Sequence, residues 1–265
     1  MPKMSTRRKL AIATWSAPNE GNIYGKLSVD ATRALAYLDK VREETGEKVT
    51  ITHFVGKVVA AALREAPGLN GYLRFGAFHP HDTVDLAFLV ALEEGSDLGK
   101  VKVERADEKR LEDLAREFGA AAAKLRAGKD QQFKKSNNLA RLLPTWVIRP
   151  LLRFIGWLTG SIGLSLPSAG LEAFPFGACI ITSVGMLGLD EGFVPPTPFA
   201  RVPVYVLLGA IRDQPVVEDG QIVVRPMLTI TATIDHRFMD GFQGGVLARK
   251  VREIFADPTL LYPAG

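Results

Sequence analysis

The hydrophobic and polar positions of this chain follow two spacings, one typical of strands and one typical of helices. Segments with alternating or short continuous apolar runs predict strands over 25–32, 84–92, 100–104, 177–185, 202–211 and 219–235. Segments with apolar side chains every three to four residues predict helices over 30–46, 50–66, 106–128 and 242–258. Strands and helices are mixed, without a repeat or an obvious linker. This order predicts one α/β domain built on a mixed sheet.

Cap and breaker residues mark the expected helix ends. Gly46 and Gly128 follow two of the helices, as glycines often do at helix C-termini. Thr50 or Thr52 is the candidate cap of the second helix, which must end before Pro67.

The segment 131–176 breaks the regular pattern. It is strongly apolar, and the thirteen residues 154–166 carry no charge. A membrane-spanning helix needs roughly 20 apolar residues, so this run is too short to cross a bilayer. We expect short helices that are interrupted near Pro144 and Pro150, with Leu151, Leu152, Ile155, Trp157 and Leu158 supplying most of the apolar contact area.

The amino-acid composition excludes several classes of protein. A chain of 265 residues with 47% hydrophobic content is long enough to bury one large core. The net charge of +4 is small, and basic and acidic residues alternate, so no nucleic-acid footprint is expected. The single cysteine, Cys179, excludes an intramolecular disulfide framework and fits a reducing compartment. The basic N-terminus lacks the apolar run of a signal peptide, which predicts a cytoplasmic protein.

The strand expected over 219–235 ends in a dense group of ionisable side chains: Asp235, His236, Arg237 and Asp240. A neutral imidazole is the usual general base near pH 7. Asp240 lies where the chain turns into the last helix. There it can cap backbone N–H groups or pair with an arginine, and so fix the loop that carries His236. For an arbitrary His-x-x-x-Asp, a purely structural polar turn is the more common role.

The whole string 235–241 resembles the Asp-His-Arg-x-x-Asp-Gly signature of the dihydrolipoamide acyltransferases. These are the core subunits of 2-oxoacid dehydrogenase complexes, related in fold to chloramphenicol acetyltransferase. The resemblance continues, in the family's order, through 50–73, 106–129, 179–191 and 219–241. It implies a two-layer fold of the chloramphenicol acetyltransferase type, with a mixed sheet, packed helices and a trimer as its assembly.

The resemblance also implies roles for individual residues. His236 takes the position of the histidine that removes a proton from the attacking thiol. Thr182 stands where the family usually has a serine whose hydroxyl stabilises the oxyanion. Ser183 points to the opposite strand face and is the weaker, substrate-binding candidate. Asp240 matches the aspartate that orients the loop, often through an N-terminal arginine, for which Arg7 and Arg8 are equal candidates.

Substrates and partners follow from the same resemblance. Coenzyme A is expected as a substrate, and no metal is expected. The family's active site lies between subunits, with the histidine on one chain and the hydroxyl on its neighbour. A homotrimer is therefore expected, and it can assemble further into a closed cage. Residues 1–265 are expected to form one catalytic-type domain without a lipoyl group, lipoyl domain or subunit-binding domain. A separate lipoyl-carrying protein or a free carrier would then bring the acyl group.

Two departures from the family pattern keep alternatives open. The family's Pro-Asp-Gly-Leu-x-x-Pro-Val stretch is replaced by the charged segment 93–107. The apolar segment 131–176 is an insertion, for which packing on a neighbouring subunit is the first expectation. A membrane-surface element flanked by arginines and a cover over the acyl site are the alternatives. A scaffold or cage subunit with weak or lost catalysis is the alternative to an acyltransferase.

Two further groups are given structural roles. His79 and His81 have a spacing that places both rings on one strand face, but zinc sites need at least three protein ligands. Cys179 lies in an apolar strand run, which favours a buried, inert thiol.

Overall fold

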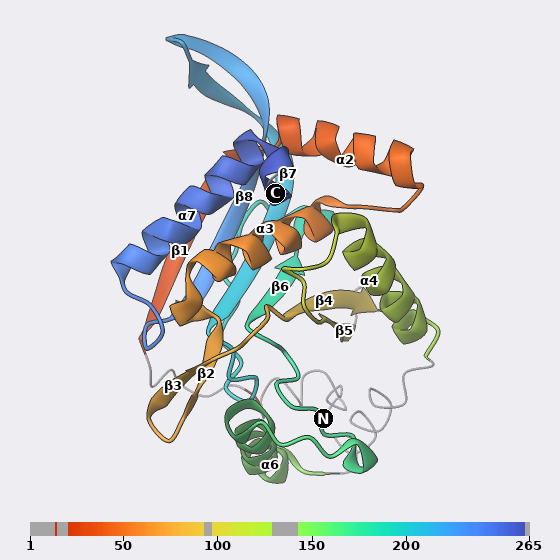
Figure 1. Cartoon of the computed structure of the whole chain (residues 1–265), viewed down its shortest axis with the longest axis vertical. Helices are drawn as coiled ribbons and strands as arrows, with labels where there is room; N and C mark the ends of the chain where they lie inside the picture. Colours follow the sequence, from red (N-terminus) through yellow and green to blue (C-terminus); the bar gives the residue numbers. More distant parts are fainter. Residues whose placement is uncertain (1–13, 15–20, 93–96, 129–142, 263–265) are drawn as a thin grey trace, which may run out of the picture.

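The structure is a computed structural model that describes residues 14, 21–92, 97–128 and 143–262 (Figure 1). Its strands are β1 (Asn22–Asp30), β2 (Gly71–Arg74), β3 (Ala77–Pro80), β4 (Leu86–Leu92), β5 (Asp97–Val103), β6 (Cys179–Ser183), β7 (Val204–Glu218) and β8 (Gln221–Asp235). Its α-helices are α2 (Thr32–Thr45), α3 (Ile51–Glu65), α4 (Leu111–Arg126), α6 (Thr145–Trp157) and α7 (Gly241–Ala256).

The main sheet has the strand order β1-β8-β7-β6-β4-β5. β6 runs parallel to both β4 and β7, whereas the other neighbouring strands pair antiparallel. The mixed sheet predicted from the sequence is therefore confirmed. β7 continues to Glu218, beyond the predicted end of its apolar run, and forms with β8 a hairpin that projects from the body (Figure 1).

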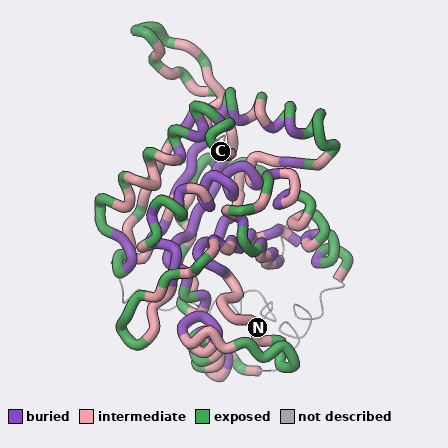
Figure 2. Tube along the Cα trace, in the orientation of Figure 1, coloured by how far each residue is buried: buried purple, intermediate pink, exposed green. Residues whose placement is uncertain are grey.

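Helices α2, α3, α4 and α7 lie together on one face of this sheet (Figure 1). The main hydrophobic core lies between the two layers, where Phe54 of α3 and Ile254 of α7 meet Ile181, Leu208 and Leu228 of the strands. Figure 2 shows the buried stretches along the central strands and the helix faces that meet them. The two-layer arrangement predicted from the sequence is confirmed.

The opposite face of the sheet is covered by the chain segment that leads into β7. Thr231 and Thr233 of β8 are both buried on this side. The hydroxyl of Thr231 donates a hydrogen bond to the carbonyl of Gly192, and the phenol oxygen of Tyr205 accepts one from the backbone N–H of Thr197 at 2.9 Å. The alternating threonines of β8 therefore serve packing on this second face.

The predicted helix caps agree with the structure. Gly46 ends α2 in a left-handed conformation with φ of 71°, which glycine adopts without steric cost. Thr50 is the N-cap of α3 and shares a capping box with His53, so it is chosen over Thr52. The helix ends at Glu65, before Pro67.

The helix predicted over 106–128 begins later, at Leu111, because the residues before it have other partners. The backbone N–H of Ala106 donates to Val84 O, and the Asp107 carboxylate accepts from the Val84 N–H at 2.9 Å. The buried ammonium of Lys57 donates to the carbonyls of Ala106 and Asp107. These bonds hold residues 106 and 107 in a turn beside β4.

The prediction for Pro150 was wrong. Helix α6 begins just after Pro144, as expected, but it runs through Pro150 to Trp157. Proline removes the hydrogen bond to the carbonyl of residue 146, one turn earlier. Both Pro150 and Trp146 lie on the exposed side of the first turns, where water can satisfy that carbonyl. Trp157, predicted as a packing residue, is exposed, and Ile148 is the buried apolar side chain of α6.

Helix α6 and the helical turn that follows it (Leu158–Ile162) pack closely on the segment 199–201 through two glycines one turn apart. A Cβ atom on Gly156 would lie 2.2 Å from the carbonyl oxygen of Phe199, and one on Gly160 would lie 3.1 Å from Arg201. The Arg201 guanidinium donates to the Ser161 hydroxyl at 2.9 Å. The close approach fixes α6 against its own chain.

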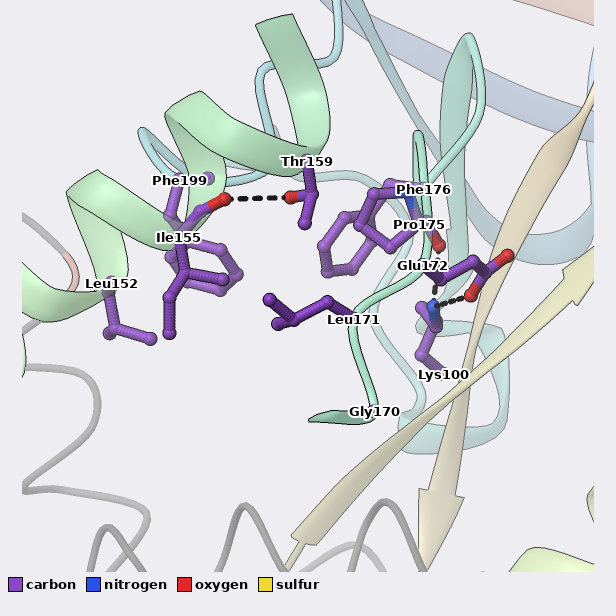
Figure 3. Close-up of a pocket in the computed structure, with 11 residues that line it drawn as sticks. Lys100, Leu152, Ile155, Thr159, Gly170, Leu171, Glu172, Pro175, Phe176 and Phe199 are labelled. Carbon is purple, nitrogen blue, oxygen red and sulfur yellow. Dashed lines mark hydrogen bonds and ion pairs between the residues drawn. The ribbon is translucent and has the colours of Figure 1, made fainter. Parts of the chain in front are cut away.

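The end of the insertion is tied to the edge strand β5 by charge. Glu172 accepts a hydrogen bond from Lys102 at 2.9 Å. It also accepts one from Lys100, which donates to Pro175 O as well (Figure 3). Burial lowers the pKa of Lys102, but the bond to Glu172 and the nearby Asp85 raise it by more, so the pKa lies above its ordinary value. A hollow of about 180 Å³ remains between this segment and the inner side of α6. Neither Thr182 nor His236 lines it.

We expect Gly156→Ala to destabilise the protein, because the added methyl group meets backbone atoms that have little room to move. Overpacking of this kind costs about 1–3 kcal/mol, which lowers Tm by several degrees. Gly119→Ala is the matched control, since Gly119 also lies within a helix but a Cβ there meets nothing within 4 Å. Thermal unfolding followed by circular dichroism should show a lower Tm only for Gly156→Ala. Equal Tm values would contradict the close packing of α6.

Candidate active site

His236 follows the last residue of β8 and is held by backbone bonds on two sides. Its N–H donates to Gly21 O at 3.2 Å, and its imidazole Nδ1 lies 2.7 Å from the carbonyl oxygen of Met239. A carbonyl oxygen only accepts hydrogen bonds, so Nδ1 carries the proton and Nε2 keeps its lone pair. The side chain is exposed in the single chain. The arrangement fixes the ring and presents a basic nitrogen outward.

The turn around His236 is stiffened by its neighbours. The Asp235 carboxylate accepts from the Arg237 backbone N–H at 3.0 Å and also binds the Arg237 guanidinium, with a closest distance of 2.6 Å. The Phe238 N–H closes the turn by donating to Asp235 O. Phe238 and Met239 are buried in the main core, so the turn is anchored from below.

Asp240 is the N-cap of α7. Its carboxylate accepts from the N–H of Phe242 at 2.9 Å and from that of Gln243 at 3.3 Å, while the Gln243 side chain accepts from the Asp240 N–H. This reciprocal capping box fixes the chain directly after His236. The Asp-x-x-Gln spacing in the sequence could have identified Gln243 as the capping partner of Asp240. No sequence pattern indicated that the Met239 carbonyl would bind the imidazole of His236. Arg7 and Arg8, the candidate partners of Asp240, lie outside the described residues.

We expect Asp240→Ala to lower the free energy of unfolding by about 0.5–2 kcal/mol, because α7 loses its cap. Asp240→Asn should keep most of the stability, since asparagine caps equally well. Urea unfolding of both variants measures the effect. Equal losses for the two variants would show that the charge, and not the cap, is what stabilises this turn.

Thr182 and Ser183 lie at the end of β6 and point to opposite faces of the sheet. Thr182 follows Ile180 on the face away from the helices, and Ser183 follows Ile181 on the helix side. Both are half-buried. The prediction that the two side chains diverge agrees with this geometry.

The structure does not bring Thr182 and His236 together within one chain. In the sheet register, Thr182 is level with Leu207 and Thr231. His236 follows Thr231 by five residues, which is about 17 Å along an extended strand, and β7 lies between β6 and β8. A proton or hydrogen bond passes over about 3 Å. A shared site therefore needs one residue from each of two chains.

The other reactive side chains have structural surroundings. Cys179 is fully buried, and burial raises the pKa of its thiol. The rings of His79 and His81 both pack on Tyr72, with centroids 5.3 and 5.2 Å away. Burial lowers the pKa of His81. Within the described ranges, no group of three or more His, Cys, Asp or Glu side chains is placed to hold a metal ion.

In the described part of the chain, no helix is both long and apolar enough to span a bilayer. The charged segment that replaces the expected proline-rich stretch is described only from residue 97 onward, so 93–96 lie outside the described residues.

The chain is similar in sequence to dihydrolipoyllysine-residue acyltransferases. The chain is 26% identical over 228 residues to a probable mitochondrial dihydrolipoyllysine-residue succinyltransferase component of the 2-oxoglutarate dehydrogenase complex of Schizosaccharomyces pombe, covering 84% of this chain and 40% of that protein. It is 26% identical over 253 residues to the dihydrolipoyllysine-residue acetyltransferase component of the acetoin cleaving system of Bacillus subtilis, covering 93% of this chain and 52% of that protein. The chain thus spans about half, or less, of each of these relatives.

Solved structures agree on the fold. A probable dihydrolipoamide acetyltransferase of Listeria monocytogenes superposes with a TM-score of 0.68 at 24% identity, over 99% of this chain and 97% of that one. The cubic core of a pyruvate dehydrogenase multienzyme complex gives 0.67 at 20% identity, over 97% and 87%. A chloramphenicol acetyltransferase gives 0.50 at 11% identity, over 96% of each chain. The fold expected from the sequence is confirmed.

A protein-family model matches most of the chain. The model of the 2-oxoacid dehydrogenases acyltransferase (catalytic domain) matches residues 4–137 and 171–262. The unmatched residues 138–170 fall within the apolar insertion and include α6. With both flanking segments matched and the fold in agreement, the chain belongs to the 2-oxoacid dehydrogenase acyltransferase family, as a catalytic domain.

Proposed function

We propose that this chain transfers an acyl group between coenzyme A and a thiol of the dihydrolipoamide type, with His236 as the general base. The observation that carries the proposal is the bond from Nδ1 of His236 to Met239 O, which leaves Nε2 as the acceptor on an exposed ring. Membership of an acyltransferase family supports this chemistry. A scaffold or cage subunit without useful turnover is the competing hypothesis.

The reaction can be written with this chain's own residues. Nε2 of His236 takes the proton of the acceptor thiol, and the thiolate forms a new bond to the thioester carbonyl carbon. The carbonyl oxygen becomes an oxyanion, which accepts a hydrogen bond from the Thr182 hydroxyl of a neighbouring chain. The carbon–sulfur bond to the donor then breaks, and His236 returns its proton to the departing thiolate. The Nδ1 bond to Met239 O becomes stronger while the ring is charged.

We infer that the working unit is at least a homotrimer, which can assemble into a larger closed cage. The distance between Thr182 and His236 along the sheet supports a site shared by two chains. One structural relative is the cubic core of a multienzyme complex, which supports further assembly. We also propose that the acyl group reaches the site on coenzyme A or on a lipoyl group.

A thiol-release assay tests the function. The panel should contain acetyl-, succinyl- and branched-chain acyl-coenzyme A, because the relatives include acetyl-, succinyl- and branched-chain-complex enzymes. We expect coenzyme A release from at least one thioester, and only with free dihydrolipoamide or a lipoylated protein domain present. No release from any donor with either acceptor would favour the scaffold hypothesis.

A further inference from the structure

Helix α6 is apolar on more than one side. On its inner side, Leu152, Ile155 and Gly156 line the hollow shown in Figure 3. Ile148 is buried on Leu143 and Leu152. A helix that uses one apolar side for docking normally presents polar residues on the other. α6 does not follow this rule.

The outer side of α6 carries a stripe of large apolar side chains. Trp146, Pro150, Phe154 and Trp157 recur at helical spacing and are all exposed. The exposed fractions are 78% for Trp146, 57% for Phe154 and 37% for Trp157. The rings of Phe154 and Trp157 stack with centroids 6.2 Å apart. Tryptophans therefore stand at both ends of the exposed stripe.

The charged residues of the sequence segment that contains this helix have one sign. Arg149 and Arg153 lie between the two tryptophans in the sequence, and they follow one edge of the exposed stripe at i, i+4 spacing. From residue 131 to residue 171, the sequence contains five basic residues and no acidic one. Tryptophan and arginine side chains with apolar residues between them are typical of helices that lie in a membrane interface. The charge is complementary to anionic lipid headgroups.

We propose that α6 is a membrane-surface element, which docks this chain onto anionic phospholipid bilayers through Trp146, Phe154 and Trp157, with Arg149 and Arg153 at the headgroups. A helix of this length is about 20 Å long, shorter than the ~30 Å apolar core of a bilayer, so it lies on the surface and does not cross it. The inner side stays bound to residues 199–201, so the catalytic domain is carried to the membrane with it.

A second copy that presents its own α6 is a poorer fit to this surface. Two copies meeting through the same side of α6 would bring the arginines of each copy together, and like charges in a protein contact are unfavourable. α6 also lies at the end of the molecule away from the projecting β7–β8 hairpin (Figure 1). Docking there leaves that hairpin clear of the lipid surface.

Vesicle flotation and tryptophan fluorescence test the proposal on the full chain. Two of the three tryptophans, Trp146 and Trp157, lie on α6. We expect the parent protein to float with vesicles that contain phosphatidylglycerol, and its emission to shift to shorter wavelength. On pure phosphatidylcholine, binding should be much weaker.

A triple variant, Trp146→Ser, Phe154→Ser and Trp157→Ser, should lose at least about tenfold in binding to anionic vesicles. Arg149→Gln and Arg153→Gln should each lose about fivefold, on anionic vesicles only.

The hairpin tip supplies a matched control. Val217, Ile222 and Val224 are exposed by 73%, 77% and 66%, so their change to serine removes the same number of exposed apolar side chains elsewhere. This control should bind anionic vesicles like the parent, and circular dichroism should show native helix content in all variants. Failure of the parent to bind anionic vesicles overturns the proposal, as does equal binding of the parent and the α6 triple variant. If the parent does not bind and the α6 variant has a smaller mass in light scattering, the surface is a protein contact.

Discussion

His236→Ala should lower kcat by about 10²–10⁴-fold, the typical contribution of a positioned general base. Met239 O fixes Nδ1 of the imidazole, which leaves Nε2 to accept a proton. The loss should appear in kcat with little change in Tm, because the exposed ring contributes little packing. Initial rates of coenzyme A release and a thermal melt give both quantities.

His236→Gln is the informative companion variant. Its amide can donate to Met239 O and so keep the turn, but it cannot accept a proton at neutral pH. We expect it to be as inactive as His236→Ala. Turnover close to that of the parent in either variant would remove His236 from the mechanism.

Thr182→Val should lower kcat by about 10²–10³-fold, the usual cost of losing one donor to the oxyanion. Valine matches threonine in shape, so the change removes the hydroxyl with little disturbance to packing. Thr182→Ser keeps the donor and should retain most of the activity. Steady-state rates for the pair separate the loss of the hydroxyl from a loss of shape.

Ser183→Ala is the matched control for this position, because it removes a hydroxyl from the next residue of the same strand. Ser183 points to the helix side of the sheet, away from Thr182. We expect near-parental kcat. A loss larger for Ser183→Ala than for Thr182→Val would reverse the two assignments.

Parts of the fold that depend only on neighbouring residues were predictable from the sequence. The alternating Thr and Ile residues of 228–234 define a strand with two different faces, and both faces are buried as that alternation requires. Gly46 and Thr50 marked helix ends because each satisfies backbone groups within a few residues. The sequence left two roles open for Asp240, capping backbone N–H groups or pairing with an arginine. Its hydrogen bonds to the first turn of α7 show that it caps this helix.

The features that local sequence patterns did not predict depend on contacts between segments far apart in the sequence. The start of α4 is delayed by bonds from Lys57 and Val84, which lie far away in sequence. Pro150 is tolerated because it lies on the exposed side of α6, which depends on where that helix docks. The separation of Thr182 from His236 within one chain was expected only from the family resemblance, because it follows from the strand order, which no single segment encodes.

We propose that each active site takes His236 from one chain and Thr182 from its neighbour. Co-expression of His236→Ala and Thr182→Val chains with different tags, followed by purification of the mixed assembly, tests it directly. In a closed ring formed at random from equal amounts, about one quarter of the sites would have both intact residues. We expect each variant alone to be nearly inactive and the mixture to recover about a quarter of parental kcat. A mixture no more active than the two variants alone would contradict it.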